Sequence, residues 1–198
     1  MDRGDRQLRW KEAIENGGGQ VTCELHRAAE LLRDGGVIAH ATEGVWGLAC
    51  DPNDAAAVAR ILEIKGREFD KGLLLIGHTA TVFEVEWVGA EHRDEVLASW
   101  PGPHTWVLPN SRFTPEVTGG RETIACRVPG HAQARALCEL FGGPLVSTSA
   151  NRSGQPALTE EEAVRSELGA EVDMVLSGEV NNPGAASAIY ALNGERLR

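Results

Sequence analysis

The chain has 198 residues, of which 42% are hydrophobic and 24% are charged, and this is the composition of a single globular domain. Its formal net charge of −10 excludes broad, nonspecific coating of nucleic acid, because such binding needs a basic surface. No apolar run of about 18 residues occurs and the N-terminus has no apolar signal segment, so we expect a cytoplasmic protein without a membrane span.

Residues 1–20 have weak periodicity and end in three glycines, so we expect a flexible N-terminal leader before a domain that covers residues 21–198. A helix is predicted to follow, with Thr22 as its candidate cap and two glycines at 35–36 as its end. Its apolar face carries Leu25, Ala28, Ala29 and Leu32. Strands are predicted next at 37–39 and 45–50.

The next predicted helix begins after Asn53, which is a good cap, and places Lys65 in line with an apolar stripe. A lysine on a buried face is costly unless its ammonium reaches a cleft or an anion. The alternative is a lysine that snorkels past the last turn and favours the helix C-terminus. The neighbouring Arg67 and Lys71 shift the balance toward a site.

Short strands and helices alternate along the rest of the chain. Strands are predicted at 73–76, 105–108, 123–128, 145–146, 174–176 and 188–192, and helices at 91–100 and 132–141. Thr159 and Glu162 form a capping box for one more helix. This alternation predicts a single α/β domain with a mixed sheet.

The four cysteines form no C-x-x-C pair and have no histidine at the spacing of a zinc finger, so neither a zinc site nor a redox dithiol is predicted. We expect reduced, mostly buried thiols. His40 and His104 are expected to be packing or edge residues rather than ligands.

Three cations follow one helix, and a run of hydroxyl and amide side chains follows about eighty residues later. The cations are Lys65, Arg67 and Lys71, and the run is residues 147–151, STSAN. Helix neighbours cannot neutralise all three cations, and Ser, Thr and Asn offer donors that suit phosphate oxygens. Together they predict a polyphosphate site that stabilises charge on a transferring group, usually with Mg²⁺. The alternative is a structural turn in which these side chains cap the backbone.

Five ordered segments resemble the YrdC-like L-threonylcarbamoyladenylate synthases in their short, single-domain bacterial form. They are residues 36–43 (GVIAHATE), 65–73 (KGREFDKGL), 100–105 (WPGPHT), 125–129 (ACRVP) and 147–154 (STSANRSG). The resemblance covers about residues 35–192. It implies a twisted, open mixed α/β sheet with flanking helices and a concave basic cleft.

The resemblance implies a nucleotidyltransferase that joins L-threonine, bicarbonate and ATP, with Mg²⁺, into L-threonylcarbamoyl-AMP and releases pyrophosphate. This is the first step of the threonylcarbamoyl modification of the tRNA adenosine beside the anticodon. The implied partners are a possible direct tRNA or RNA contact and the downstream proteins that transfer the threonylcarbamoyl group. Such chemistry needs charge neutralisation and alignment more than a strong base, which suits a site rich in cations.

The same resemblance assigns roles to individual side chains. Lys65 and Arg67 would be catalytic. The ATP-binding residues would be Lys65, Arg67, Lys71, Thr123, Ser149 and Asn151. The threonine-binding residues would be Thr42, Arg127, Ser147 and Ser187, and no metal-binding side chain is implied.

Two other functions stay open at the level of the sequence. The first is an RNA-binding or ribosome-maturation module that uses the same cleft without chemistry, although the net charge of −10 and the scattered aromatic residues count against it. The second is a different carbamoyl acceptor, because Gly44 stands where many relatives have a threonine-binding hydroxyl and Ile76 stands about where longer relatives have a histidine.

Overall fold

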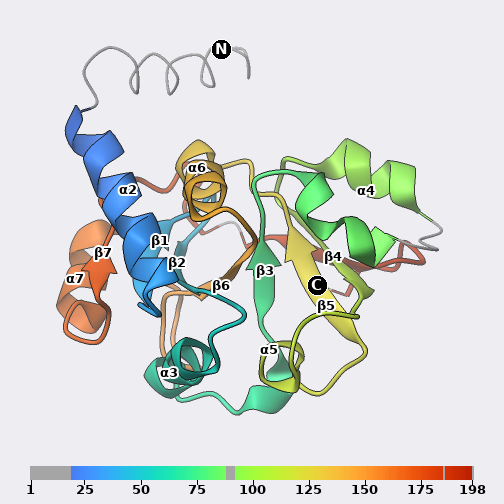
Figure 1. Ribbon diagram of the computed structural model, residues 1–198, viewed down its shortest axis with the longest axis horizontal. Coiled ribbons are helices and arrows are strands. Elements are labelled where there is room, and N and C mark those ends of the chain that lie inside the picture. The colour runs from blue at the N-terminus through green and yellow to red at the C-terminus, as the bar shows by residue number, and fades with distance from the viewer. Residues whose placement is uncertain (1–18, 88–91, 185, 198) are drawn as a thin grey trace.

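The computed structural model describes residues 19–87, 92–184 and 186–197 of the chain (Figure 1). Its helices are α2 (Gly19–Arg33), α3 (Ala55–Lys65), α4 (Arg93–Ser99), α5 (Pro115–Thr118), α6 (Ala132–Phe141) and α7 (Glu161–Leu168), with 3₁₀ segments η1 (Phe69–Lys71) and η2 (Ala80–Trp87). Its strands are β1 (Ile38–Ala41), β2 (Trp46–Cys50), β3 (Leu74–Ile76), β4 (His104–Pro109), β5 (Thr123–Arg127), β6 (Leu145–Ser149), β7 (Met174–Val175) and β8 (Ala188–Ala191).

All eight strands form one sheet, in the order β7-β1-β2-β6-β3-β5-β4-β8. The pairs β1–β7, β3–β5 and β4–β8 are parallel, and the other neighbours are antiparallel. The order does not close on itself, so the sheet is open with β7 and β8 at its edges. The predicted α/β class with a mixed, twisted, open sheet and flanking helices is confirmed.

The two faces of the sheet bury two separate hydrophobic clusters. Neighbouring strand residues alternate between the clusters, as Leu75 and Ile76 do, because successive side chains of a strand point to opposite faces. On one face α2 and α6 pack together (Figure 1). On the other face the apolar sides of α3, α4, α5 and α7 contribute to the larger cluster.

The first helix begins earlier than predicted. It starts at Gly19, so Thr22 lies inside α2 instead of capping it, and the Thr22 carbonyl lies 2.8 Å from His26 Nδ1. The predicted apolar face of α2 is fully buried. Residues 1–18 of the predicted leader lie outside the described residues, and residues 19 and 20 belong to the helix.

The predicted caps of two other helices are also wrong. Asp51 Oδ1 accepts hydrogen bonds from the backbone and side-chain nitrogens of Asn53, so the cap of α3 is the next residue, Asp54, which accepts from Ala57 N at 2.9 Å. The predicted box at Thr159 does not form, because Glu160 takes the cap position of α7 without a side-chain bond.

The remaining predicted elements agree with the structure to within three residues at each end, and α6 matches 132–141. Residue 91 of the predicted helix 91–100 lies outside the described residues. The short elements η1, η2 and α5 were not predicted, since segments of one or two turns carry little periodicity.

The cysteines are free, and three of them are buried, whereas Cys23 is exposed. Within the described ranges, no helix is long and apolar enough to cross a membrane.

Replacing Asp54 with alanine is expected to destabilise the fold by about 1 kcal/mol, because the first turn of α3 loses its side-chain acceptor. Thermal unfolding should show this as a fall of roughly 2–4 °C in Tm. Asp54→Asn should stay close to wild type, because asparagine caps equally well. Asn53→Ala is the matched control, and a larger loss in that variant than in Asp54→Ala would contradict the assignment.

Candidate active site

One cavity of about 740 Å³ opens between the ends of β2 and β6, strands β4 and β5, the segment η1 to β3, and residues 186–189. Nine of the ten predicted site residues line it: Thr42, Arg67, Lys71, Thr123, Arg127, Ser147, Ser149, Asn151 and Ser187. Segments more than a hundred residues apart in the chain therefore meet in one place.

Positive charge is concentrated in the lining of this cavity. Four cationic side chains line it, and none of the described lining residues is a carboxylate. They are Arg67, Lys71, Arg121 and Arg127. In a chain with a net charge of −10, such a lining favours an anionic ligand.

Arg67 is held by the backbone just beyond α3. Its Nη2 donates to the carbonyls of Lys71 at 3.1 Å and Gly72 at 2.9 Å. Its Nε is buried and has no hydrogen-bond partner within the described part of the chain. Burial and the nearby charge of Arg121 lower its pKa. The Arg67 guanidinium is therefore fixed at the cavity beside a second cation, and two neighbouring cations favour an anionic ligand.

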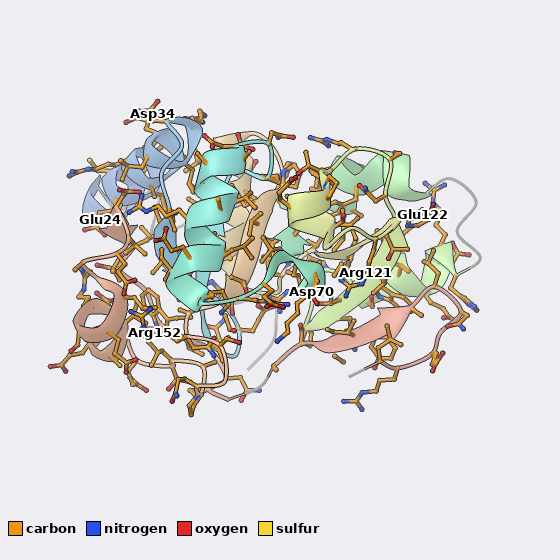
Figure 2. The ribbon with its side chains drawn as sticks, turned by 90° about the horizontal axis from the view of Figure 1, so that it is seen from below. Glu24, Asp34, Asp70, Arg121, Glu122 and Arg152 are labelled. Carbon is orange, nitrogen blue, oxygen red and sulfur yellow. The ribbon has the colours of Figure 1, made fainter. Side chains whose placement is uncertain are left out.

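Arg121 is close to the same backbone turn. A Cβ placed on Gly72, whose φ is +64°, would lie 2.8 Å from the Thr118 carbonyl oxygen and 2.9 Å from Arg121 Nη1, so the left-handed backbone and the close Thr118 carbonyl favour glycine there. Asp70 and Arg121 lie on the face of the molecule that Figure 2 shows, where Arg121 is exposed.

Lys65 does not line the cavity. It is 3% exposed at the C-terminal end of α3, and its ammonium donates to the carbonyls of Ser149 at 2.5 Å and Asn151 at 2.9 Å and to Asn151 Oδ1 at 3.2 Å. An ammonium has three protons, and these three oxygens use them all. Burial, with a smaller effect of the Arg67 charge, lowers the pKa of Lys65 to about 8.

The turn after β6 is tied together by Asn151. Its Oδ1 accepts from Ser149 Oγ at 2.6 Å as well as from Lys65, and its Nδ2 donates to the carbonyls of Arg152 and Gln155. The turn interpretation of residues 147–151 is thus confirmed, and their role in binding a ligand stays a prediction. The hydrogen bonds that shape the turn also fix the side chains that line the cavity.

The other end of the cavity carries Arg127, at the end of β5. The side chains of Arg127 and Glu43 are 8% and 14% exposed, and Arg127 Nη2 lies 3.4 Å from Glu43 Oε2. Nearby, Ser187 Oγ lies 2.9 Å from Thr105 Oγ1, and the Thr42 hydroxyl donates to the Val45 carbonyl at 2.6 Å. This end therefore presents a buried guanidinium that is paired with Glu43 and lies among hydroxyl groups, and a guanidinium has five N–H donors, enough to bind a second carboxylate as well.

Sequence reasoning missed Arg121, Glu43 and Gln155. Glu43 is part of the segment 36–43 and could have been paired with Arg127 as its counter-ion. Arg121 follows two glycines in a loop and carries no periodic signal, so only the three-dimensional arrangement shows that it lies beside Arg67.

Three comparisons with known proteins show what this chain is similar to. The model of the Sua5, YciO and YrdC family, described as "Telomere recombination", matches residues 30–198. A "Threonylcarbamoyl-AMP synthase" of Alkalilimnicola ehrlichii is 48% identical over 170 residues, which cover 83% of this chain and 89% of that protein. One of the same name from Xanthomonas euvesicatoria is 45% identical, covering 89% and 98%.

Among solved structures, the P. abyssi Sua5 complexed with L-threonine superposes with a TM-score of 0.82 and 34% identity. The match covers 88% of this chain and 53% of that one, so this chain spans about half the length of that Sua5 protein. The E. coli YciO structure is 24% identical with a TM-score of 0.72, covering 84% of this chain and 82% of YciO, and supports the fold alone.

Proposed function

This chain belongs to the Sua5, YciO and YrdC family, and we infer from its curated relatives that it is a threonylcarbamoyl-AMP synthase, an enzyme of the nucleotidyltransferase type that uses ATP as a substrate. The observation that carries this inference is the identity of 45–48% to proteins of that name over most of both chains. The RNA-binding alternative has no comparable support.

We propose that the phosphates of ATP bind at the end of the cavity that Arg67, Lys71 and Arg121 line, with Thr123, Ser149 and Asn151 beside the nucleotide. The cationic lining of this end and the lack of lining carboxylates support this placement. Lys65 would act from outside the cavity, because its ammonium donates hydrogen bonds to the carbonyls of Ser149 and Asn151 and so stabilises the turn that carries them.

We place L-threonine at the other end of the cavity. The Arg127 guanidinium would bind its carboxylate, and Thr42, Ser147 and Ser187 would surround its amino and hydroxyl groups. The L-threonine bound to the related Sua5 protein supports a pocket of this kind. Glu43 would hold Arg127 in place through their buried ion pair.

The reaction then follows from this arrangement. Bicarbonate takes up a proton and loses water to give CO₂. The neutral threonine amine adds to CO₂ and releases a proton to solvent, which gives a carbamate. A carbamate oxygen attacks the α-phosphorus of ATP, the bond to the β-phosphate oxygen breaks, and pyrophosphate leaves with the electron pair. Fixed cations at the phosphate end stabilise the negative charge that develops on the leaving pyrophosphate. Binding both substrates in one cavity aligns the carbamate oxygen with the α-phosphorus.

Mg²⁺ would reach this site with ATP. Within the described ranges, no group of three or more His, Cys, Asp or Glu side chains could hold a metal ion, and the lining of the cavity contains no carboxylate. Phosphate oxygens are common ligands of Mg²⁺, so the ion would be bound through the nucleotide.

We also propose that the product passes to proteins that transfer the threonylcarbamoyl group to the tRNA adenosine beside the anticodon. A reaction that consumes ATP and serves tRNA suits the cytoplasm. Direct contact with tRNA would involve the cationic rim at Lys71 and Arg121.

The function is tested by pyrophosphate release from ATP and bicarbonate with and without L-threonine. We expect release that depends on threonine, together with a product that contains the threonyl, carbamoyl and AMP groups by mass spectrometry. Pyrophosphate release that is the same with and without threonine, serine or any other amine would contradict the function. RNA affinity that falls steeply with salt and ignores ATP would then favour the binding module.

A further inference from the structure

A buried histidine lies directly behind the threonine end of the cavity. His40, on β1, has no exposed surface, and its Nε2 lies 3.3 Å from Ser147 Oγ on β6. Strand β2 lies between these two strands, and Gly47 on β2 pairs with His40. A Cβ on Gly47 would lie 3.1 Å from Ser147 Oγ and 3.2 Å from His40 Nε2. The imidazole therefore reaches Ser147 across Gly47, where a side chain would crowd both atoms.

The surroundings of His40 determine which atom carries the proton. Its Nδ1 lies 3.1 Å from the Ala41 carbonyl, which can only accept, so Nδ1 carries the hydrogen. Burial first, then the nearby His131 and Arg127, lower the pKa of His40 to about 4, so the ring is neutral at pH 7. The bare Nε2 is then an acceptor, and the Ser147 hydroxyl must donate to it.

This hydrogen bond decides what Ser147 can recognise. A serine hydroxyl has one proton and two lone pairs, and the proton is committed to His40. Ser147 lines the cavity, so it presents only an acceptor to a ligand there. Arg127, which lines the same cavity, presents only donors. An α-amino acid, with a carboxylate at one end and an N–H donor at the other, is complementary to this pair.

We propose that His40 is a positioning residue that fixes the Ser147 hydroxyl as a hydrogen-bond acceptor for an N–H or O–H group of the amino-acid substrate. The inference rests on the proposed function, since it assumes that L-threonine binds beside Ser147. Without His40 the Ser147 hydroxyl would rotate freely. Its proton could then point into the cavity, where it would meet the N–H or O–H donor of the substrate. The role of His40 is therefore orientation, and it accepts no proton from the substrate.

The test compares His40→Phe, which keeps a ring but no acceptor, with His40→Gln, whose amide oxygen can take the place of Nε2. We expect His40→Phe to raise the KM for L-threonine about tenfold, which corresponds to the loss of one hydrogen bond, and to leave the KM for ATP within about twofold. His40→Gln should recover most of the threonine affinity. Circular dichroism and thermal unfolding establish that both variants are folded.

A double-mutant cycle with Ser147→Ala separates orientation from packing. If His40 acts through the Ser147 hydroxyl, His40→Phe has no further effect on the KM for threonine in the Ser147→Ala background. Equal effects of His40→Phe in both backgrounds, or equal rises in both KM values, would overturn the proposal. A wild-type protein that releases pyrophosphate without any dependence on threonine would instead overturn the proposed function, so the two failures are distinguishable.

Discussion

Arg67→Ala is expected to lower kcat/KM for ATP by roughly 10²–10³, the loss found when one preorganised donor is removed from a developing charge. The side chain is half-buried, lines the cavity, and is anchored through Nη2 on two backbone carbonyls. Arg67→Lys should recover only a small part of the lost kcat/KM. An ammonium cannot bind the two carbonyls and a phosphate with the planar geometry of a guanidinium. Steady-state pyrophosphate release over a range of ATP concentrations measures the effect.

Arg112→Ala is the matched control for charge. It removes the same positive charge from an exposed loop, where Arg112 lies 4.9 Å from the centre of the Phe113 ring and does not line the cavity. We expect its kcat/KM to stay within about twofold of wild type, because exposed charges outside the site are screened by salt. If Arg67→Ala behaved like Arg112→Ala, the ATP phosphates would have to bind elsewhere.

The sequence predicted the elements whose signals are local and periodic. The face of α2 made of Leu25, Ala28, Ala29 and Leu32 is buried as expected, and Gly142 ends α6 in the left-handed conformation that follows a helix. The cap of α3 was misplaced by one residue, because Asn53 and Asp54 are both good caps. The choice between them depends on Asp51, which already binds Asn53.

The candidate site was predicted as a set of residues, whereas their mutual geometry was not. Resemblance to a family points to Arg67, Arg127 and Ser147, because each lies in one of the five segments that resemble the family. The bond between His40 and Ser147 depends on the strand order β1-β2-β6, and no pattern within either segment encodes that order. His40 was expected to be a packing residue, and its complete burial agrees with this, but its Nε2 also lies 3.3 Å from the hydroxyl of Ser147, which lines the cavity.

Lys65→Met is expected to lower kcat/KM by about a hundredfold, because the turn after β6 loses the hydrogen bonds from the ammonium that keep it in place. Methionine has a similar length and fills the same space without any donor, so two backbone carbonyls and Asn151 Oδ1 lose a partner. Hydrogen exchange of residues 147–155 should become faster in the free enzyme, because opening of the turn costs less. Activity and exchange measured on the same variant link the two effects.

Lys71→Met provides the contrast for this experiment. Lys71 is exposed and lines the cavity, so its loss should weaken ATP binding and leave the exchange of residues 147–155 as in wild type. Unchanged exchange in Lys65→Met, together with lost ATP affinity, would mean that Lys65 turns toward the phosphates when ATP binds. The assignment of Lys65 to the turn would then be wrong.

The titration of Lys65 gives a second, independent readout. Above its pKa of about 8 the neutral amine has two protons for three acceptors, so activity should fall as the pH rises through 8 in the wild type, and this fall should be absent from the residual activity of Lys65→Met. The titration of Lys65 does not itself destabilise the fold over this pH range. Folding lowers this pKa below its ordinary value of 10.5, so between these two values the unfolded chain binds more protons and Lys65 contributes more stability as the pH rises.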